Sequence, residues 1–525
     1  MKRYIEFLST ISLIVLLLST TIMVAGEDIS YPTTEWQTST PEEQGMDSAE
    51  LAGFFEMFSQ KHFNMDSLMV IRNGHIIAEA YTPPFDADMK HHLYSSSKSV
   101  TSALIGILLQ EGYLDNLDTT VLSLFPDRTV QNVDANKEAM TVRHLLTMSS
   151  GFACDDMATG NQSLHAMMNS EDWLQYALDM PMGSEPGTEF HYCNAVTYVL
   201  SAIINEKTGM SALDYAAEKL FAPLGISDYA WSSSPQGISY GFSDLQLTIR
   251  DMAKFGYLYL RGGEWDGTQI IPADFVQASI VGQIETGWPD TGYGYQWWYV
   301  PSIGTASTLG WGGQYIDIDP QNDRIAVLTG GFTENTRPML QGYPFFYSTF
   351  ALSAGDQALP QNLEAQNQLN DVVARIEEPE PGLVESMPEM ALQVTNQNYT
   401  LFGPMPIAVR GALGEVGTVN PVSLSFEFSD NSQQANLTFM LDNGEAWILP
   451  VGLKGIYEVS EGPIGPVGAL GEWETDEQFS VFIKYIGDAK LQRFVMNFMP
   501  NEVNILASEY TGSTTYAVQG VVMEG

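Results

Sequence analysis

Hydrophobic and polar positions change their spacing along the chain, and these changes predict the order of the elements. Residues 67–81 alternate around Asn73-Gly74, which predicts a β-hairpin because Asn-Gly is the strongest short turn signal between alternating segments. Two later segments run from Ser95 to Gly112 and from Val196 to Gly209. Their apolar residues recur at helical spacing on nearly all sides, which predicts two buried helices. From residue 292 onward the pattern indicates strands again.

An early hairpin, central helices and late strands favour an α+β fold, in which one antiparallel sheet is built from both ends of a domain and is flanked by helices. We assign this domain to residues 30–355 and expect an all-helical subdomain, with helices and loops over 148–190 forming a lid. The aromatic run 292–300 is expected to be one strand. Its aromatic residues either line an acyl pocket or, for Trp297 and Tyr299, form sheet core.

The composition shifts after this domain. Residues 356–390 contain EEPEPG and show little periodicity, which is typical of a linker. Beyond them, strict alternation over 422–428, 435–441 and 479–485, with turns between, predicts a small all-β barrel or sandwich over residues 391–525. No catalytic constellation is present in this region.

The N-terminal residues 1–26 have the features of a signal peptide. Lys2 and Arg3 precede an apolar stretch over 11–18, and 24–26 offer a small-residue cleavage site. The apolar stretch is shorter than the roughly 20 residues that a spanning helix needs. We therefore expect a secreted or extracytoplasmic protein with no stable membrane insertion beyond the signal peptide. An uncleaved N-terminal anchor is the alternative.

The charge balance excludes some partners. The chain carries a formal net charge of −42 with only 22 Lys and Arg, while 44% of its residues are hydrophobic. Such a surface repels nucleic acid and anionic membranes, so no nucleic-acid partner is expected. A saline habitat and an ordinary acidic exported protein both fit this composition, and the oligomeric state stays open.

Two cysteines, Cys154 and Cys193, can form one disulfide in an oxidising compartment. Two buried thiols are the alternative, since spacing alone does not place the two Cα atoms within bonding range.

Ser95 and Lys98 are the first candidate catalytic pair. They lie three residues apart at the start of a predicted buried helix, so their side chains share one face. A serine hydroxyl needs a base to become a good nucleophile, and a lysine whose pKa is lowered by burial can be that base. S-x-x-K is a weak signal by itself, but its position at the start of an apolar helix is much rarer.

Two further motifs follow in chain order. Tyr192-Cys193-Asn194 precedes the second buried helix. The Tyr192 phenol can shuttle a proton and the Asn194 amide can orient a lysine or a substrate. Trp311-Gly312-Gly313-Gln314 then enters a strand. Its glycines allow close backbone approach, so the N–H groups of Gln314 and Ser95 can form an oxyanion hole.

This order of motifs resembles the serine β-lactamase and penicillin-binding-protein superfamily, whose signatures are S-x-x-K, Y-x-N and a K-T-G-like strand. The chain is most similar to class C β-lactamases, family VIII carboxylesterases, 6-aminohexanoate-dimer hydrolases and DD-peptidases. Stretches at 141–152, 221–226 and 247–263 extend the resemblance over roughly residues 35–355. The C-terminal region resembles the lipocalin-like accessory domains of some β-lactamase-related proteins.

The resemblance implies a β-lactamase/transpeptidase-like fold and a role for each motif. Ser95 matches the acylated serine, Lys98 its base partner, Tyr192 the general acid/base and Asn194 a positioning residue. Residues 311–314 take the place of the third motif. Either Lys98 or a Tyr192 phenolate can accept the proton of Ser95. No cofactor and no metal are implied.

Trp311 departs from the pattern, because the lactamases of the family usually carry Lys at this position, where it can pair with the carboxylate of the antibiotic. An aromatic residue there favours a small ester or amide substrate over a β-lactam or a cell-wall peptide. A β-lactamase or DD-peptidase is the first alternative. An inactive surface binding or scaffold protein is the alternative from another class.

Other candidate groups are weaker. Ser239 lies in a G-x-S-x-G match, but that motif needs a strand before it and a helix after it, and loops are expected on both sides here. His91, His92 and His191 lie beside the catalytic motifs without metal-ligand spacing. Ser239 is expected to be a serine of a substrate loop, and structural or cleft-lining roles are expected for the histidines.

Overall fold

The computed structural model describes residues 31–60, 64–331, 338–378, 387–407, 419–428, 433–462, 465–509 and 515–522. The predicted signal peptide, residues 1–26, lies outside this part of the chain. Two separate hydrophobic cores define a first domain and a C-terminal domain. Across the described ranges, no helix combines the length and apolar character needed to cross a membrane.

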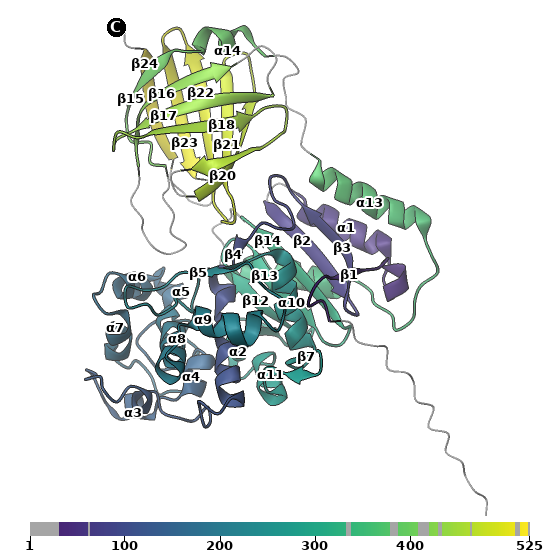
Figure 1. The fold of residues 1–525 in the computed structure, drawn as a ribbon, viewed down its shortest axis with the longest axis vertical. Coiled ribbons are helices and arrows are strands. Elements are labelled where there is room, and N and C mark those ends of the chain that lie inside the picture. The colour runs from purple at the N-terminus through teal and green to yellow at the C-terminus, as the bar shows by residue number, and fades with distance from the viewer. Residues whose placement is uncertain are drawn as a thin grey trace, which may run out of the picture. The chain divides into compact units, whose positions relative to one another are not determined.

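A nine-stranded sheet forms the centre of the first domain (Figure 1). Its order is β1, β3, β2, β14, β13, β12, β11, β10, β9, and all neighbouring pairs are antiparallel except β1 and β3. The early strand β2 pairs with the late strand β14, so the prediction of one sheet built from both ends of the domain is confirmed. The strands span Gln37–Thr38, Met65–Arg72, His75–Tyr81, Ile284–Glu285, Gly292–Tyr293, Trp298–Val300, Thr305–Gly310, Gln314–Asp319 and Arg324–Gly330 for β1, β2, β3 and β9 to β14.

The predicted hairpin is present between β2 and β3. Arg72 pairs with His75, and the turn residues Asn73 and Gly74 have φ angles of 50° and 78°. Both angles lie in the left-handed region that this two-residue turn requires. Local turn chemistry therefore fixes the register of the first two strands.

Helices cover both faces of the sheet. On β13, Ile316 meets α10 (Ile249–Leu260), where a Cβ on Gly256 would lie 2.8 Å from the Ile316 side chain. The neighbouring Tyr315 points to the opposite face and packs on Phe345 and Phe346 of α12 (Pro338–Ala351). Alternation along one strand thus buries it between two helical layers.

The helix α13 (Leu363–Glu377) was not expected. It packs against α1 (Ser48–Phe58) and β3, and Leu369, Val372 and Ile376 join the core of the first domain. The prediction of a linker with little regular structure over 356–390 is therefore wrong for residues 363–377. Apolar residues spaced one or two turns apart bury a single stripe of this otherwise polar helix.

Two buried helices organise the helical subdomain. Residues Ser97 to Leu108 of α2 (Ser97–Gln110) are all buried, and α2 packs against α8 (Asn194–Thr208). Each helix is followed by a glycine in the left-handed conformation, at Gly112 and Gly209, as the sequence predicts. The remaining helices of this domain are α3 to α7, α9 and α11, over Ala135–Ala139, Val142–Leu146, Asp156–Thr159, Gln162–Met168, Trp173–Asp179, Ala212–Ala216 and Ala273–Ser279.

Short strands complete the domain. The order β4-β6-β5 forms a three-stranded sheet, and β7 pairs with β8. These strands span His91–His92, Ala230–Trp231, Leu245–Leu247, Glu264–Trp265 and Thr268–Gln269 for β4 to β8.

The aromatic run 292–300 differs from its prediction. It forms two short antiparallel strands, β10 and β11, with Gln296 between them at a φ of 63°. The turn breaks the expected alternation. Trp297 is fully buried against Phe255 and Tyr259 of α10, whereas Trp298 packs elsewhere.

The C-terminal domain is a ten-stranded sheet, of which nine strands close into a β-barrel and β19 pairs with β20 outside the closed ring (Figure 1). Strands β18 to β15 and β24 to β20 follow one another in the sheet, and pairing of Gly452 in β18 with Leu470 in β20 closes it. Between the predicted barrel and sandwich, the structure selects the barrel. The helix α14 (Glu389–Val394) precedes strands β15 to β24 over Asn398–Phe402, Pro421–Phe428, Gln434–Leu441, Ala446–Gly452, Glu458–Gly462, Gly465–Trp473, Gln478–Tyr485, Leu491–Met499, Glu502–Glu509 and Thr515–Val522.

The strand pattern explains why the barrel forms. In β17, Ala435, Leu437, Phe439 and Leu441 are buried, and the residues between them are not. One side of each strand therefore supplies the barrel core.

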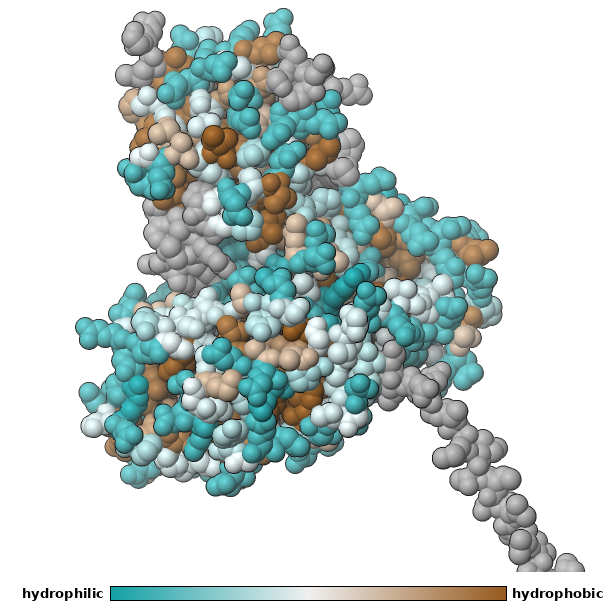
Figure 2. Space-filling model, in the orientation of Figure 1, coloured by the Kyte–Doolittle hydropathy of each residue, from teal (hydrophilic) through white to brown (hydrophobic). Residues whose placement is uncertain are grey.

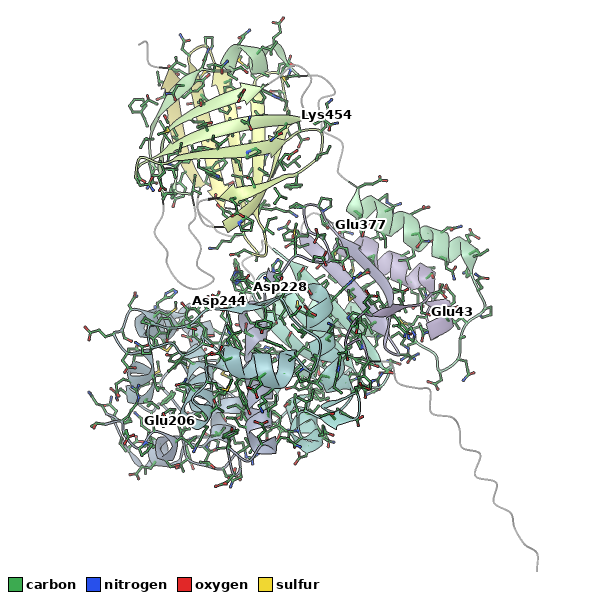
Figure 3. All side chains as sticks on the ribbon, viewed as in Figure 1. Glu43, Glu206, Asp228, Asp244, Glu377 and Lys454 are labelled. Atoms are coloured by element: carbon green, nitrogen blue, oxygen red, sulfur yellow. A yellow bond between two sulfur atoms is a disulfide. The ribbon has the colours of Figure 1, made fainter. Side chains whose placement is uncertain are left out.

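Acidic side chains are spread over the surface. Exposed Glu43, Glu206, Asp228 and Glu377 come from four different segments (Figure 3). Figure 2 shows hydrophilic residues over most of the face in view, with hydrophobic residues in scattered groups.

Candidate active site

Ser95 and Lys98 meet at the start of α2. Ser95 lies in the 3-10 turn Tyr94–Ser96, and Lys98 lies in the first turn of α2. Lys98 Nζ is 3.0 Å from Ser95 Oγ. Tyr94, directly before Ser95, has a φ of 47°, a conformation that costs a non-glycine residue about 1–3 kcal/mol and is often found at functional sites.

Lys98 Nζ contacts two further oxygen atoms. It donates to Asn194 Oδ1 and to the carbonyl of Phe242, each at 2.7 Å. A neutral amine has two N–H groups and one lone pair. Because the two carbonyl oxygens can only accept, they take both N–H groups, and the lone pair of neutral Lys98 faces Ser95 Oγ.

Burial favours the uncharged form of both candidate bases, Lys98 and Tyr192, and therefore shifts their pKa values in opposite directions. It lowers the pKa of Lys98 to about 7, and the negative charge of Asp156 raises it in part. Burial also raises the pKa of Tyr192 well above its ordinary value, although a hydrogen bond with Ser95 opposes this change. Near neutral pH, Lys98 is therefore partly a free amine and Tyr192 is a phenol.

Tyr192 forms one wall of the site. Its ring centre is 4.9 Å from Lys98 Nζ, and Trp298 stacks on it with ring centres 6.0 Å apart. Trp288 stacks on Trp298 in turn at 5.5 Å, and Phe190 packs on Trp298 at 5.8 Å. Tyr192, which lies beside Lys98, is thus backed by a stack of aromatic rings.

The third motif is the turn between β12 and β13. Ser96 Oγ donates to the backbone carbonyl of Gln314 at 2.8 Å, which places the first residue of β13 beside Ser95. Gly312 and Gly313 have φ angles of 79° and 103°, so the turn needs glycines. Trp311 is 38% exposed and packs edge-on against Tyr94 with ring centres 5.2 Å apart.

Cys154 and Cys193 are joined in a disulfide with a Cα–Cα distance of 5.6 Å. Cys193 is also the N-cap residue of α8. With Asp156, the two sulfurs form the one His/Cys/Asp/Glu group among the described residues whose donor atoms cluster tightly enough for a metal ion. Because each sulfur is bonded to the other, the group offers no thiolate ligand.

The structure places the weaker candidates away from a catalytic arrangement. Ser239 is fully buried, and its hydroxyl accepts a hydrogen bond from the Leu213 N–H at 3.1 Å. His91 pairs with Asp66 at 3.0 Å and His92 with Asp244 at 3.3 Å. His191 is part-exposed and lies 3.1 Å from Glu189.

The structure therefore brings Ser95, Lys98, Tyr192 and Asn194 together, with the backbone of Gln314 beside them. Sequence reasoning missed Phe242 and Asp156. The contribution of Phe242 is a backbone carbonyl, which every residue type supplies, so no sequence signal could have found it. Trp298 is in the aromatic run that was predicted to line an acyl pocket, but the sequence did not predict its contact with Tyr192.

Comparison with known proteins places this arrangement in a family. Residues 42–338 match the Beta-lactamase family. The chain belongs to this family and is a serine hydrolase of the β-lactamase-related type.

Individual relatives are distant. The chain is 25% identical to 6-aminohexanoate-dimer hydrolase from Paenarthrobacter ureafaciens over 283 residues, covering 50% of this chain and 71% of the relative. It is 24% identical to penicillin-binding protein 4 from Amycolatopsis lactamdurans over 294 residues, covering 47% and 75%. A solved Bacillus anthracis structure, assigned as a 6-aminohexanoate-dimer hydrolase, shares the fold with a TM-score of 0.51 at 21% identity, covering 61% of this chain and 89% of that one.

Proposed function

We propose that this protein is an exported hydrolase that cleaves carboxylic esters or small amides through an acyl-enzyme on Ser95. The observation that carries the proposal is the environment of Lys98. Its Nζ lies 3.0 Å from Ser95 Oγ, both of its N–H groups meet carbonyl oxygens, and its pKa is lowered to about 7. These features make Lys98, and not a Tyr192 phenolate, the base that accepts the Ser95 proton.

Acylation follows from these positions. Neutral Lys98 takes the hydroxyl proton as Ser95 Oγ bonds to the substrate carbonyl carbon. The backbone N–H groups of Ser95 and Gln314 hold the oxyanion. As the carbonyl reforms, the bond to the leaving oxygen or nitrogen breaks. The Tyr192 phenol gives its proton to that atom and is reprotonated from the Lys98 ammonium.

Deacylation repeats the sequence with water. Lys98, neutral again, accepts a proton from water through Tyr192 or directly, and the hydroxide bonds to the acyl carbon. The same two N–H groups stabilise the second oxyanion. The proton then passes to Ser95 Oγ as its bond to the acyl group breaks, which releases a carboxylic acid and restores the enzyme.

The substrate class is inferred from the walls of the site. Trp311 stands where the lactamases of the family usually carry Lys, and it offers an aromatic face and one N–H instead of a charge. The Tyr192 ring beside Lys98 is backed by the stacked rings of Trp298 and Trp288. An uncharged acyl group suits these walls better than the carboxylate of a β-lactam, because a buried anion needs a paired cation.

Turnover of p-nitrophenyl butyrate and of nitrocefin tests the proposal. The wild-type protein is expected to hydrolyse the ester much faster than it opens nitrocefin. Ser95→Ala should abolish ester turnover, whereas Ser239→Ala, the matched serine control, should retain it. Fast nitrocefin turnover with slow ester turnover would overturn the substrate assignment and favour a β-lactamase. Full ester turnover by Ser95→Ala would overturn the mechanism.

Export rests on the signal-peptide features of residues 1–26. The Cys154–Cys193 disulfide supports it, because such bonds persist in oxidising compartments. Recovery of the processed protein outside the cytoplasm of an expression host is the expected result. Full-length protein confined to the cytoplasm would contradict it.

A further inference from the structure

Asp156 connects the two residues that flank Cys193. It is the first residue of α5 and is 1% exposed. Its backbone N–H donates to the Tyr192 carbonyl at 2.8 Å. Its Oδ2 accepts from the Asn194 backbone N–H at 2.8 Å and from Asn194 Nδ2 at 2.9 Å, while Oδ1 accepts from the Leu164 N–H at 3.3 Å.

These bonds decide which atom of the Asn194 amide meets Lys98. A carboxylate can only accept hydrogen bonds, so the Asn194 amide must turn its NH₂ group toward Asp156. The amide oxygen then faces Lys98 Nζ, where it lies at 2.7 Å. With the amide reversed, Asn194 Nδ2 would face Lys98 and donate to the lone pair of its neutral amine. That lone pair would then no longer be available to the Ser95 hydroxyl.

The disulfide spans the same gap as these hydrogen bonds. Cys154 is two residues before Asp156, and Cys193 lies between Tyr192 and Asn194. The two sulfurs and a carboxylate oxygen of Asp156 lie within 4.8 Å of one another. The disulfide therefore ties the segment that carries Asp156 to the N-terminus of α8, 39 residues further along the chain.

We propose that Asp156 is a positioning residue for Lys98, that it acts through Asn194, and that the Cys154–Cys193 disulfide holds it in place. This inference rests on the proposed function, because it concerns how the base at the Ser95 site is oriented.

The charge of Asp156 provides a distinctive readout. The titratable groups that face Lys98 are Ser95 on its own turn, Tyr192 before α8 and Asp156 on α5. Of these, Asp156 raises the pKa of Lys98 and burial lowers it. Outside this group, His191 lies 3.7 Å from Asp155 at the part-exposed edge of the same segment.

The test is the pH profile of kcat/KM for Asp156→Asn. Removing the negative charge lowers the pKa of Lys98, so the acidic limb should move to lower pH. Asparagine keeps only one acceptor oxygen where Asp156 uses two, for Asn194 and for the Leu164 N–H, so Asn194 should also be held less firmly. Plateau kcat should then fall, by on the order of 100-fold if Lys98 moves by about 1 Å. Asp155→Asn is the matched control, because Asp155 caps α5 through the Ala158 N–H and asparagine caps equally well.

A profile of Asp156→Asn equal to that of Asp155→Asn would overturn the inference. So would a lower plateau with an unmoved acidic limb, since a merely structural role predicts that result. Labelling of wild-type Ser95 by a fluorophosphonate separates the two proposals. If the adduct does not form, the proposed function fails. If it forms and the acidic limb of Asp156→Asn does not move, only the role assigned to Asp156 fails.

The disulfide is tested by Cys154→Ser/Cys193→Ser, which also keeps the proposal testable if Asp156→Asn does not fold. Without the disulfide, Asp156 should move away from Asn194. The acidic limb of the pH profile and the plateau kcat should then both change in the same direction as in Asp156→Asn. A lower melting temperature with an unchanged pH profile would show that the disulfide only stabilises the fold and would overturn its assigned role.

Discussion

The pKa of Lys98 gives a quantitative prediction for the pH dependence of hydrolysis. An ordinary lysine, with a pKa of 10.5, is a free amine in only about 1 of 3,000 molecules at pH 7. With the pKa lowered to about 7 by burial, about half of the Lys98 side chains are free amines at that pH. Because the free amine is the active form, activity is gained as pH rises through the pKa of Lys98.

We therefore expect kcat/KM for p-nitrophenyl butyrate to be half-maximal near pH 7 and about tenfold below its plateau at pH 6. Lys98→Arg should lose this activity at every pH, because a guanidinium does not deprotonate in this range. Lys254→Arg is the matched control, since Lys254 is also buried but pairs with Asp251 on α10 at 3.1 Å. A half-maximal pH above 9, or full activity in Lys98→Arg, would refute the assignment of Lys98 as base.

Four further variants test the site and the fold. Tyr192→Phe should lower kcat for p-nitrophenyl butyrate by about 10²- to 10⁴-fold in steady-state assays, because the leaving group loses its proton donor. Trp311→Lys should raise the ratio of nitrocefin to ester turnover, by about tenfold for each 1.4 kcal/mol of new ion pairing, and an unchanged ratio would contradict the role given to Trp311. Leu104→Ala in α2 should lower the free energy of unfolding by about 2–5 kcal/mol in urea titrations, since Leu104 is fully buried. Leu369→Ala should also destabilise the first domain by about 2 kcal/mol or more if α13 belongs to its core, and a change below about 0.5 kcal/mol would contradict that packing.

Local patterns were sufficient where one physical cause dominates. The Asn73-Gly74 turn has few alternatives, and a helix apolar on all sides such as α2 must be buried. The S-x-x-K spacing at the start of α2 then placed Lys98 within reach of Ser95. These features need only a short stretch of sequence, which is why they could be predicted.

Other features depend on what a segment meets in the fold. The apolar stripe of α13 contains few residues on a mostly polar helix, so its sequence resembles that of a linker, and the helix is stabilised by the surface that α1 and β3 supply. The direction of Trp298 depended on the break at Gln296. Asp156 belongs to no motif, and its importance arises only from its contacts with Asn194.

Intact-mass spectrometry after incubation with a fluorophosphonate, followed by peptide mapping, tests directly whether Ser95 is the nucleophile. One adduct per molecule is expected on Ser95, formed equally in Ser239→Ala and absent in Ser95→Ala. An unlabelled wild-type protein, or an adduct that persists in Ser95→Ala, would contradict the assignment of Ser95 as the nucleophile.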